Sequence, residues 1–224
     1  MTSIAAALVA LALAQAQADQ QKEPPPHPPP ASSRPPVPSL LSAETLQGTS
    51  LFAAGVGWPR VELAYAQGVS KVTDLGLATA FDYTTTEFFA GGTYRGAILP
   101  DLPPYQGALR LSLAWYHDSG GTWLYKKNHE DQGLYLGLGA SYSHRVEGGL
   151  VSLLADVPLT FTFAKDGGVL VNPKASFAYE APLYGPFTLG VELGLGLRFG
   201  FGDAPQKEAV GEVTLLGLAS YRVF

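Results

Sequence analysis

The sequence predicts an all-β fold, an antiparallel up-and-down transmembrane β-barrel of ten strands, preceded by a disordered proline-rich segment; eight or twelve strands are the alternatives. The first observation is alternation, since every second residue over 187–199 is apolar, which is strand geometry. The second is that glycine and charge fill the positions between them, and a polar lumen with apolar residues facing lipid is typical of a membrane barrel. The third is the total of 26 glycines, which relieve crowding inside a narrow lumen.

The composition excludes several classes of function. A formal net charge of -5 disfavours nucleic acid as a partner. The chain has no cysteine, which excludes a disulfide framework, a thiolate metal site, a cysteine nucleophile and a lipoprotein anchor. Because it also lacks a phosphate loop, a zinc-protease helix and a dinucleotide-binding fingerprint, the sequence predicts no cofactor and no metal.

Two segments are expected to precede the barrel. Residues 1–18 are interpreted as a signal peptide, because an apolar run from Ile4 to Ala14 is followed by an A-x-A cleavage pattern. This run is too short to cross a hydrocarbon core of about 30 Å as a helix, so strands must make any membrane crossing. Residues 19–48 are predicted to be a disordered periplasmic segment, because 23–38 is mostly proline.

The barrel is predicted to span 49–224. Proline-containing turns at Trp58-Pro59 and at Pro100 to Pro104 precede its second and fifth strands. Each strand is recognised by apolar residues at alternate positions. In chain order the first five are 49–57 (Phe52, Ala54, Val56), 60–67 (Val61, Leu63, Tyr65), 73–83 (Leu75, Leu77, Phe81), 86–98 (Phe88, Ala90, Tyr94) and 105–117 (Leu109, Leu111, Leu113, Trp115).

The same alternation predicts five further strands after a long loop at 118–132. They are 133–144 (Leu134, Leu136, Leu138, Tyr142), 150–163 (Val151, Leu153, Val157, Leu159), 169–180 (Val169, Val171, Phe177), 186–201 (Leu189, Leu193, Leu195) and 209–224. The even total lets the barrel close with both termini on one side, which we expect to be the periplasm.

Aromatic residues gather at both ends of the predicted strands, as girdles at two membrane interfaces would. The predicted aromatic belts comprise Trp58, Tyr65, Phe81, Phe88, Tyr94, Trp115, Tyr142, Phe161, Phe177 and Phe199. A soluble sandwich or lipocalin-like barrel is the alternative, but it would expose this apolar exterior to water.

The signal peptide, the alternating strands, the aromatic belts and the final Phe224 give residues 49–224 a family resemblance. This part of the chain resembles small Gram-negative outer-membrane β-barrels, of the OmpA/OmpX-like or small porin-like classes. The resemblance implies that Phe224, with Tyr221 shortly before it, belongs to the signal read by the barrel-assembly machinery. Members often carry an aromatic residue two places before the end, where this chain has Arg222, and this predicts a bulge or an atypical register in the last strand.

The inward positions of the predicted strands carry charges of both signs. Mixed signs in a narrow lumen predict ion pairs across it, which avoid the cost of lone buried charges. The predicted lumen network comprises Glu62, Glu87, Arg95, Arg110, Asp156, Lys174, Glu192, Arg198 and Glu212. An eight-stranded barrel is just filled by side chains and ten strands add little width, so a largely plugged lumen is the leading interpretation. An ion pathway lined by charge is the alternative.

Two candidate catalytic pairs fail because consecutive strand residues point to opposite faces. His117 and Asp118 lie near the predicted outer rim, where a hydrolase would activate water, and Ser143 and His144 would be needed together in a lipase. The sequence therefore predicts no catalytic residue and no enzyme.

The loop 118–132 combines aromatic and cationic residues just above the predicted outer leaflet. Trp123, Lys126 and Lys127 form a candidate contact for lipopolysaccharide, whose phosphates lysine can bind as a point charge. The alternative is a strand hairpin that extends beyond the membrane.

These features predict a non-enzymatic barrel in the cell outer membrane with a structural, adhesive or envelope-organising role. The alternative function is a narrow, porin-like passive channel for ions or small solutes, and the third is a rim-located hydrolase. The expected partners are outer-membrane lipid, lipopolysaccharide and the barrel-assembly machinery, with a periplasmic or peptidoglycan contact through the proline-rich segment and no nucleic acid.

Overall fold

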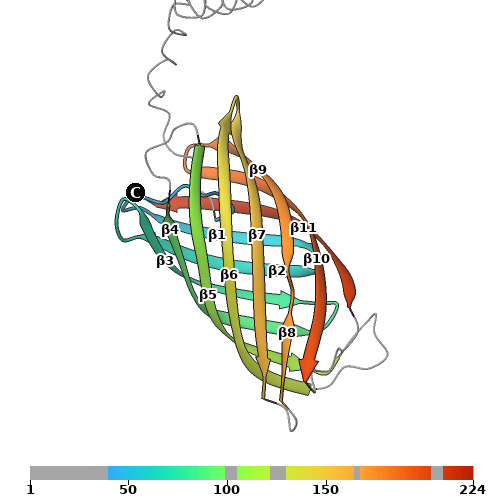
Figure 1. Ribbon diagram of the computed structural model, residues 1–224. Helices are drawn as coiled ribbons and strands as arrows, with labels where there is room; N and C mark the ends of the chain where they lie inside the picture. The colour runs from blue at the N-terminus through green and yellow to red at the C-terminus, as the bar shows by residue number, and fades with distance from the viewer. Residues whose placement is uncertain (1–39, 99–104, 122–129, 164–166, 203–208, 224) are drawn as a thin grey trace, which may run out of the picture. The chain divides into compact units, whose positions relative to one another are not determined.

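The computed structural model describes residues 40–98, 105–121, 130–163, 167–202 and 209–223, which belong to one compact unit (Figure 1). No helix in this described part of the chain is long and apolar enough to cross a membrane. The strands are β1 (Ser50–Trp58), β2 (Arg60–Gly68), β3 (Thr73–Asp82), β4 (Glu87–Ala97), β5 (Tyr105–Ser119), β6 (Glu130–Val146), β7 (Gly149–Thr162), β8 (Gly168–Val171), β9 (Lys174–Tyr184), β10 (Phe187–Gly202) and β11 (Val210–Val223).

The sheet closes on itself into a barrel. Neighbouring strands pair antiparallel, and β1 pairs with β11 as well as with β2, so that the wall has no free edge. β8 and β9 share one position in the wall, because both pair with β7 on one side and β10 on the other. The eleven described strands therefore occupy ten wall positions, which confirms the predicted ten-strand up-and-down barrel.

The predicted strand bounds agree closely with the structure, with three differences, the first of which is that β9 continues to Tyr184, beyond the predicted end at 180. β5 continues to Ser119 and β6 begins at Glu130, so both strands extend into the predicted loop. The eighth predicted strand is interrupted at Asn172 and Pro173, because proline has no N–H to offer the ladder. The Asn172 N–H still donates to the Pro158 carbonyl oxygen at 3.0 Å, which joins β8 to β7 across the interruption.

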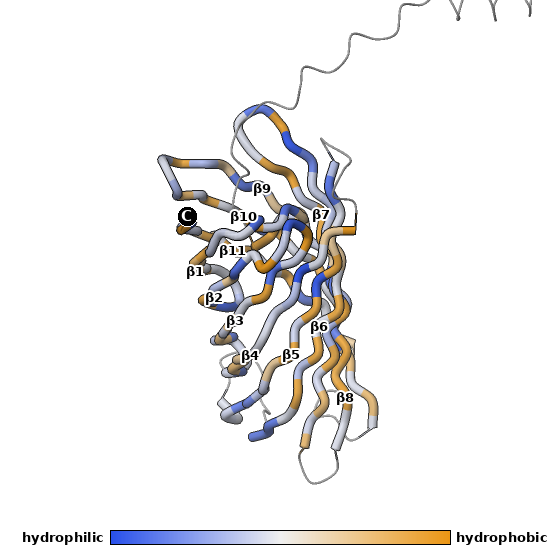
Figure 2. Tube along the Cα trace, turned by 90° about the vertical axis from the view of Figure 1, so that its left-hand side faces the viewer, coloured by the Kyte–Doolittle hydropathy of each residue, from blue (hydrophilic) through white to orange (hydrophobic). Residues whose placement is uncertain are grey.

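The two faces of the wall differ in polarity. We call the end with Ser50 and Val223 the terminal end, and the end with Trp58 and Val210 the distal end. Along the middle of β10, Leu195 is exposed on the outer face while Glu192 is buried in the lumen. Figure 2 shows hydrophobic residues recurring along the strands between more polar ones. An apolar outer face around a charged lumen is the arrangement that suits a barrel surrounded by lipid.

The last strand runs in unbroken register with both neighbours. β11 pairs with β1 up to Val223 and with β10 up to Tyr221. Tyr221 is exposed and Arg222 is buried, so over the described residues the predicted bulge or atypical register was wrong. Arg222 fits this register because its Nε donates to Thr49 Oγ1 inside the terminal end, at 2.7 Å. Phe224, the other residue of the predicted assembly signal, lies outside the described residues.

Candidate functional site

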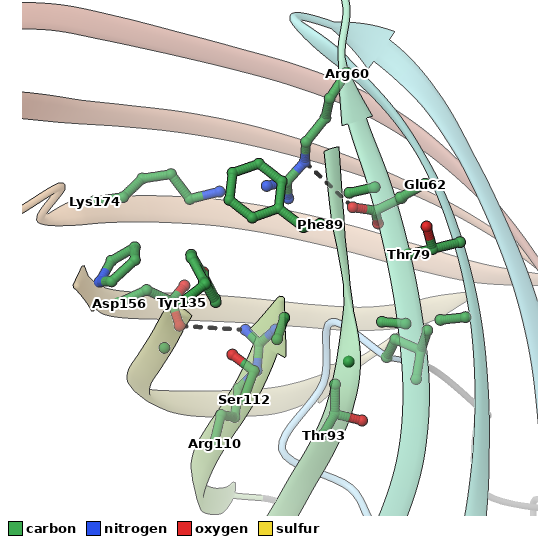
Figure 3. A pocket seen from close by; sticks show the side chains of 18 of the residues that line it. Arg60, Glu62, Thr79, Phe89, Thr93, Arg110, Ser112, Tyr135, Asp156 and Lys174 are labelled. Atoms are coloured by element: carbon green, nitrogen blue, oxygen red, sulfur yellow. Dashed lines mark ion pairs between the residues drawn. The ribbon is translucent and has the colours of Figure 1, made fainter. Parts of the chain in front are cut away.

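The lumen holds a polar cavity of ≈ 310 Å³. All nine residues of the predicted charge network line it, together with the charged residues Arg60, Asp74 and Asp82. Figure 3 shows part of this lining, with side chains converging from several strands. Alternation along each strand places these charges on the inner face, but it does not determine which of them meet.

Four of the ion pairs join charges on the same or nearby wall positions. Asp74 and Arg95 are direct register partners, with Arg95 Nε 2.8 Å from Asp74 Oδ2. Lys174 Nζ lies 2.7 Å from Glu192 Oε1 on the neighbouring strand. The other two pairs are longer and are drawn in Figure 3: Arg60 to Glu62 at 3.2 Å and Arg110 to Asp156 at 3.8 Å. These four pairs leave the centre of the cavity unbridged.

A fifth pair crosses the lumen near the distal end. Arg198 on β10 makes two hydrogen bonds to the Glu87 carboxylate on β4, one of them 3.0 Å long. In the ring of ten wall positions, β4 and β10 are five positions apart in either direction, so they face each other. Glu212 lies 3.9 Å from the same guanidinium. Because the Arg198 and Glu87 side chains are both largely buried, this pair acts as a crossbar with little access to water.

Three aromatic side chains project from the wall into the lumen near this crossbar. Phe89 packs against Tyr116 and Tyr135, with ring centroids 5.4 Å and 5.2 Å apart. The Tyr116 hydroxyl lies 3.4 Å from both Glu87 and Asp118, and this side chain is fully buried. These three residues were not among the predicted site residues, because the predicted aromatic belts comprise only outward-facing side chains. The same alternation along the strands points Phe89, Tyr116 and Tyr135 inward.

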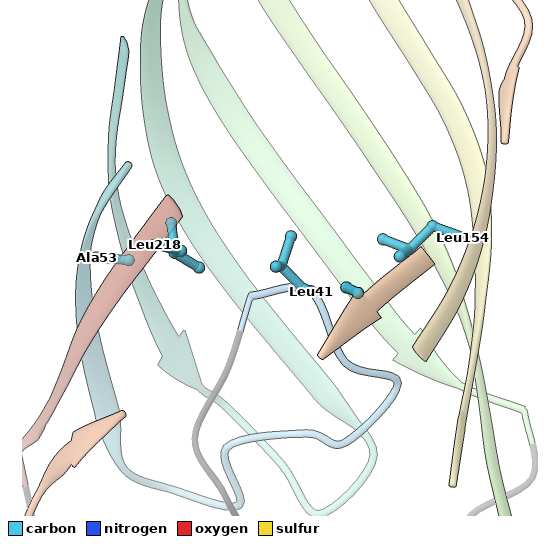
Figure 4. Packing of buried hydrophobic residues seen from close by; sticks show 5 residues of the cluster. Leu41, Ala53, Leu154 and Leu218 are labelled. Atoms are coloured by element: carbon cyan, nitrogen blue, oxygen red, sulfur yellow. The ribbon is translucent and has the colours of Figure 1, made fainter. Parts of the chain in front are cut away.

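The terminal end of the lumen is occupied by the chain itself. Residues 40–46, which we call the plug segment, precede β1 and are buried except for the half-buried Leu40. Leu41 packs against inward side chains from four strands: Ala53, Leu154, Ala178 and Leu218 (Figure 4). Leu40 and Leu41 line the polar cavity, so the plug segment forms its floor at this end.

Polar contacts hold the plug segment to the surrounding wall. The segment donates three hydrogen bonds to the wall and its neighbouring turn: Ala43 N–H to Ser143 Oγ at 2.7 Å, Leu46 N–H to Asp74 Oδ1 at 2.9 Å, and Thr45 Oγ1 to the Lys71 carbonyl at 2.8 Å. It accepts two from arginines, Arg95 Nη1 to the Ser42 carbonyl at 3.0 Å and Arg222 Nη2 to the Leu46 carbonyl at 3.1 Å. Buried main-chain groups outside a strand need such partners, because leaving them unpaired would cost free energy.

Glu44 supplies the charge of the plug segment. Its carboxylate accepts two hydrogen bonds from Arg145, at 2.6 and 2.7 Å, in a bidentate pair. Burial raises the pKa of the Glu44 carboxyl above its ordinary value, and the Arg145 guanidinium acts in the opposite direction. Arg95 and Arg222 also lower the pKa of Glu44, so all three arginines favour its charged form, with Arg145 contributing most.

The barrel body thus begins earlier in the chain than the predicted boundary at residue 49. Residues 19–48 were predicted to form one disordered proline-rich segment, whereas residues 41–46 are buried inside the barrel. The signal available was the composition change after Pro38, where prolines stop and Leu40, Leu41 and Leu46 appear. A segment this short has no periodicity that would reveal its burial.

We expect Ser143→Ala to destabilise the barrel by about 1–3 kcal/mol, because the buried Ala43 N–H would lose its acceptor. Ser141→Ala is the matched control: Ser141 is also a buried serine on β6, and its hydroxyl has no hydrogen-bond partner among the described residues. Urea unfolding in detergent micelles measures both changes, and equal losses of stability would contradict the assigned contact.

The predicted belt residues lie on the outer wall, exposed or half-buried. Several pack against other aromatic rings. The ring centroids of Phe88 and Trp115 lie 6.3 Å apart near the distal end, and those of Tyr142 and the stacked Tyr105 lie 6.0 Å apart near the terminal end. The predicted lipopolysaccharide contact at Trp123, Lys126 and Lys127 lies outside the described residues.

The candidate catalytic pairs are separated by the wall. His117 stacks on the exposed Trp115, whereas Asp118 is buried in the lumen. His144 stacks on Tyr105, whereas Ser143 is buried beside Ser152. Among the described residues, no group of three or more histidine, aspartate or glutamate side chains is arranged to hold a metal ion. The described part of the chain therefore brings together neither of these catalytic pairs.

No protein-family model matches the chain, and no curated protein matches its sequence. Among solved structures, the chain is similar to a loop L8 deletion mutant of OmpT, an outer membrane protein of Vibrio cholerae. The TM-score is 0.27 at 9% identity, and the match covers 79% of this chain and 97% of that chain. A likeness at this level carries no argument about function. The closed antiparallel wall, with its apolar exterior and charged lumen, is the arrangement that transmembrane β-barrels of the outer-membrane type adopt.

Proposed function

We propose that the protein is a non-enzymatic outer-membrane barrel with a closed lumen, serving a structural, adhesive or envelope-organising role. The observation that carries the proposal is closure at two levels, by the plug segment at the terminal end and by the Arg198–Glu87 crossbar toward the distal end. We expect a barrel obstructed at both levels to offer no continuous water path, so that its working surfaces are its outer face and its ends.

The outer face supports placement in a lipid bilayer. Large apolar side chains are exposed around the whole wall, among them Val56, Leu77 and Leu195. In water, such an exterior would drive association, whereas lipid covers it without cost. We place both termini in the periplasm, so that the 118–132 hairpin faces outward, where lipopolysaccharide is the expected contact. The proline-rich segment would then reach periplasmic or peptidoglycan partners, and Tyr221 with Phe224 would serve recognition by the barrel-assembly machinery.

A narrow passive channel is the second candidate, and the polar cavity favours it. The cavity is lined by charges of both signs, as ion pathways are. Conduction would require the plug segment and the crossbar to leave the lumen together. Each is held by buried hydrogen bonds and charge pairs, and for this reason we rank the channel below the closed barrel.

Planar-bilayer recordings of the refolded wild-type protein test the closed lumen. We expect little steady conductance, because both closures must be displaced before ions can pass. A variant that carries Arg198→Ala and Leu41→Asp serves as the positive control, since it weakens the crossbar and the plug segment together. Stable open channels in the wild type would reject the closed barrel and support the passive channel.

A further inference from the structure

The plug segment is held inside the barrel without being part of its wall. No residue of 40–48 belongs to a strand. The wall closes through the antiparallel ladder between β1 and β11, which begins where Ser50 pairs with Val223. Four hydrogen bonds join the main chain of the plug segment to wall side chains: Ser143 and Asp74 accept from main-chain N–H groups, and Arg95 and Arg222 donate to main-chain carbonyl oxygens. These contacts can be exchanged without breaking a ladder of the sheet, as contacts to a ligand can.

The wall around the plug segment presents distinct subsites. An apolar subsite formed by Ala53, Leu154, Ala178 and Leu218 receives Leu41. Arg145 receives the Glu44 carboxylate through two hydrogen bonds. A second apolar subsite, formed by Leu51 and Ala66, receives Leu46. The spacing of the occupants is Leu-x-x-Glu-x-Leu, and each occupant meets a wall group of matching chemistry.

Charge complementarity favours an acidic peptide at this position. The wall contributes Arg95, Arg145, Arg222 and Asp74 to the contacts, and the buried Glu180 lies close enough to interact with Arg95. Together these groups carry a formal charge of +1, against −1 for Glu44. The cationic groups bind two carbonyl oxygens and one carboxylate, which are acceptors that an acidic peptide provides.

The connection from the plug segment to β1 is short, exposed and sharply turned. Gln47 and Gly48 are exposed, and both have positive φ, 50° and 88°. This left-handed pair reverses the chain, so that it leaves the lumen before it enters the wall, and glycine suits such a backbone. The turn passes close to Gly68 of the wall, where a Cβ would lie 2.5 Å from Gly48 N. Because glycine has no side chain, Gly68 leaves room for the reversal. The reversal separates the plug segment from the ladder and gives it an accessible hinge.

We propose that the terminal end of the lumen is a peptide-binding site, occupied in cis by residues 40–46 of the chain, and that the plug segment is exchangeable. The ligand class is an acidic peptide with leucines flanking a glutamate. Because Leu40 and Leu41 line the polar cavity, departure of the segment uncovers that cavity from the terminal end. A pull on the preceding proline-rich segment would act directly on the plug segment.

Cleavage at the hinge tests the proposal on the folded full-length protein. A protease recognition sequence is inserted between Gln47 and Gly48, and the refolded protein is cut in detergent. We expect the N-terminal fragment, which contains residues 40–47, to stay bound through gel filtration, and to be displaced saturably by a synthetic peptide of residues 40–47. Heat-modifiable gel migration reports that the barrel remains folded after cleavage.

Charge reversal provides the discriminating variants. The synthetic peptide carrying Glu44→Arg should compete at least tenfold more weakly, and it requires no change in the barrel. An Arg145→Glu barrel should restore its competition, whereas Gln47→Ala in the peptide should change nothing. Loss of the fragment immediately after cleavage, or equal competition by the wild-type and Glu44→Arg peptides, would overturn the proposal. These readouts measure binding, so a wild-type barrel that conducts would reject the closed-lumen function without deciding this one.

Discussion

Arg198→Ala should lower the free energy of unfolding by about 3–5 kcal/mol, because it leaves the Glu87 carboxylate uncompensated in a closed lumen. Arg198 bridges two opposite strands and both partner side chains are largely buried, so water cannot readily replace the guanidinium. Tyr116 remains close to Glu87 at 3.4 Å, but a single neutral hydroxyl cannot offset the lost charge. Urea unfolding in micelles, followed by gel migration and tryptophan fluorescence, measures the effect.

The double variant Arg198→Ala with Glu87→Gln is the matched control. Removing both charges of a buried pair is far less costly than removing one, so we expect it to recover most of the lost stability. If Arg198→Ala instead left stability unchanged and the barrel conducted with altered ion selectivity, water would be reaching Glu87 and the crossbar would not close the lumen.

Leu195→Arg should cost about 2–4 kcal/mol, since it places a charge on the lipid-facing surface near the middle of the wall. Leu195 lies midway along β10, paired with Val213 on β11 and Ala175 on β9. The measurement is unfolding in lipid vesicles, where the depth of the substituted residue determines the cost.

Leu183→Arg separates depth from exposure. Leu183 is 65% exposed and Leu195 is 64% exposed, so the two leucines differ in position rather than in accessibility. Leu183 lies near the β9–β10 turn at the terminal end, where the same change should cost only about 0–1 kcal/mol. Equal costs at both positions would contradict a bilayer centred on the middle of the wall.

The sequence carried most of the information about the wall. Alternation over long strands identified the strand positions, the inner and outer faces and the count of ten, because a period of two is visible without knowledge of the neighbours. Strand alternation also separated His117 from Asp118 before any geometry was known. Interruptions are harder to predict: Pro173 splits one strand, yet β8 and β9 still share one position in the wall.

The pairing inside the lumen could not be predicted from the sequence. Alternation gives the face of a residue but not its height or its angular position around the barrel, and Arg198 meets a carboxylate 111 positions away in the chain. The plug segment is missed for a related reason. Its residues Leu41 and Glu44 find their partners on strands far along the chain, and seven residues without regular structure carry no periodic signal.

The interruption between β8 and β9 has a mechanical consequence. A closed barrel resists changes of cross-section as a hoop does, and the hydrogen-bonded ladders carry the tension around its circumference. At Asn172 and Pro173 the ladder has fewer hydrogen bonds, because Pro173 has no N–H to donate and Pro158 on the facing strand has none either. Asp156 and Lys174 are register partners beside this gap and point into the lumen. This sector of the wall, where two prolines remove ladder donors, therefore carries two members of the charge network, and a change of its width would alter the separation of those charges.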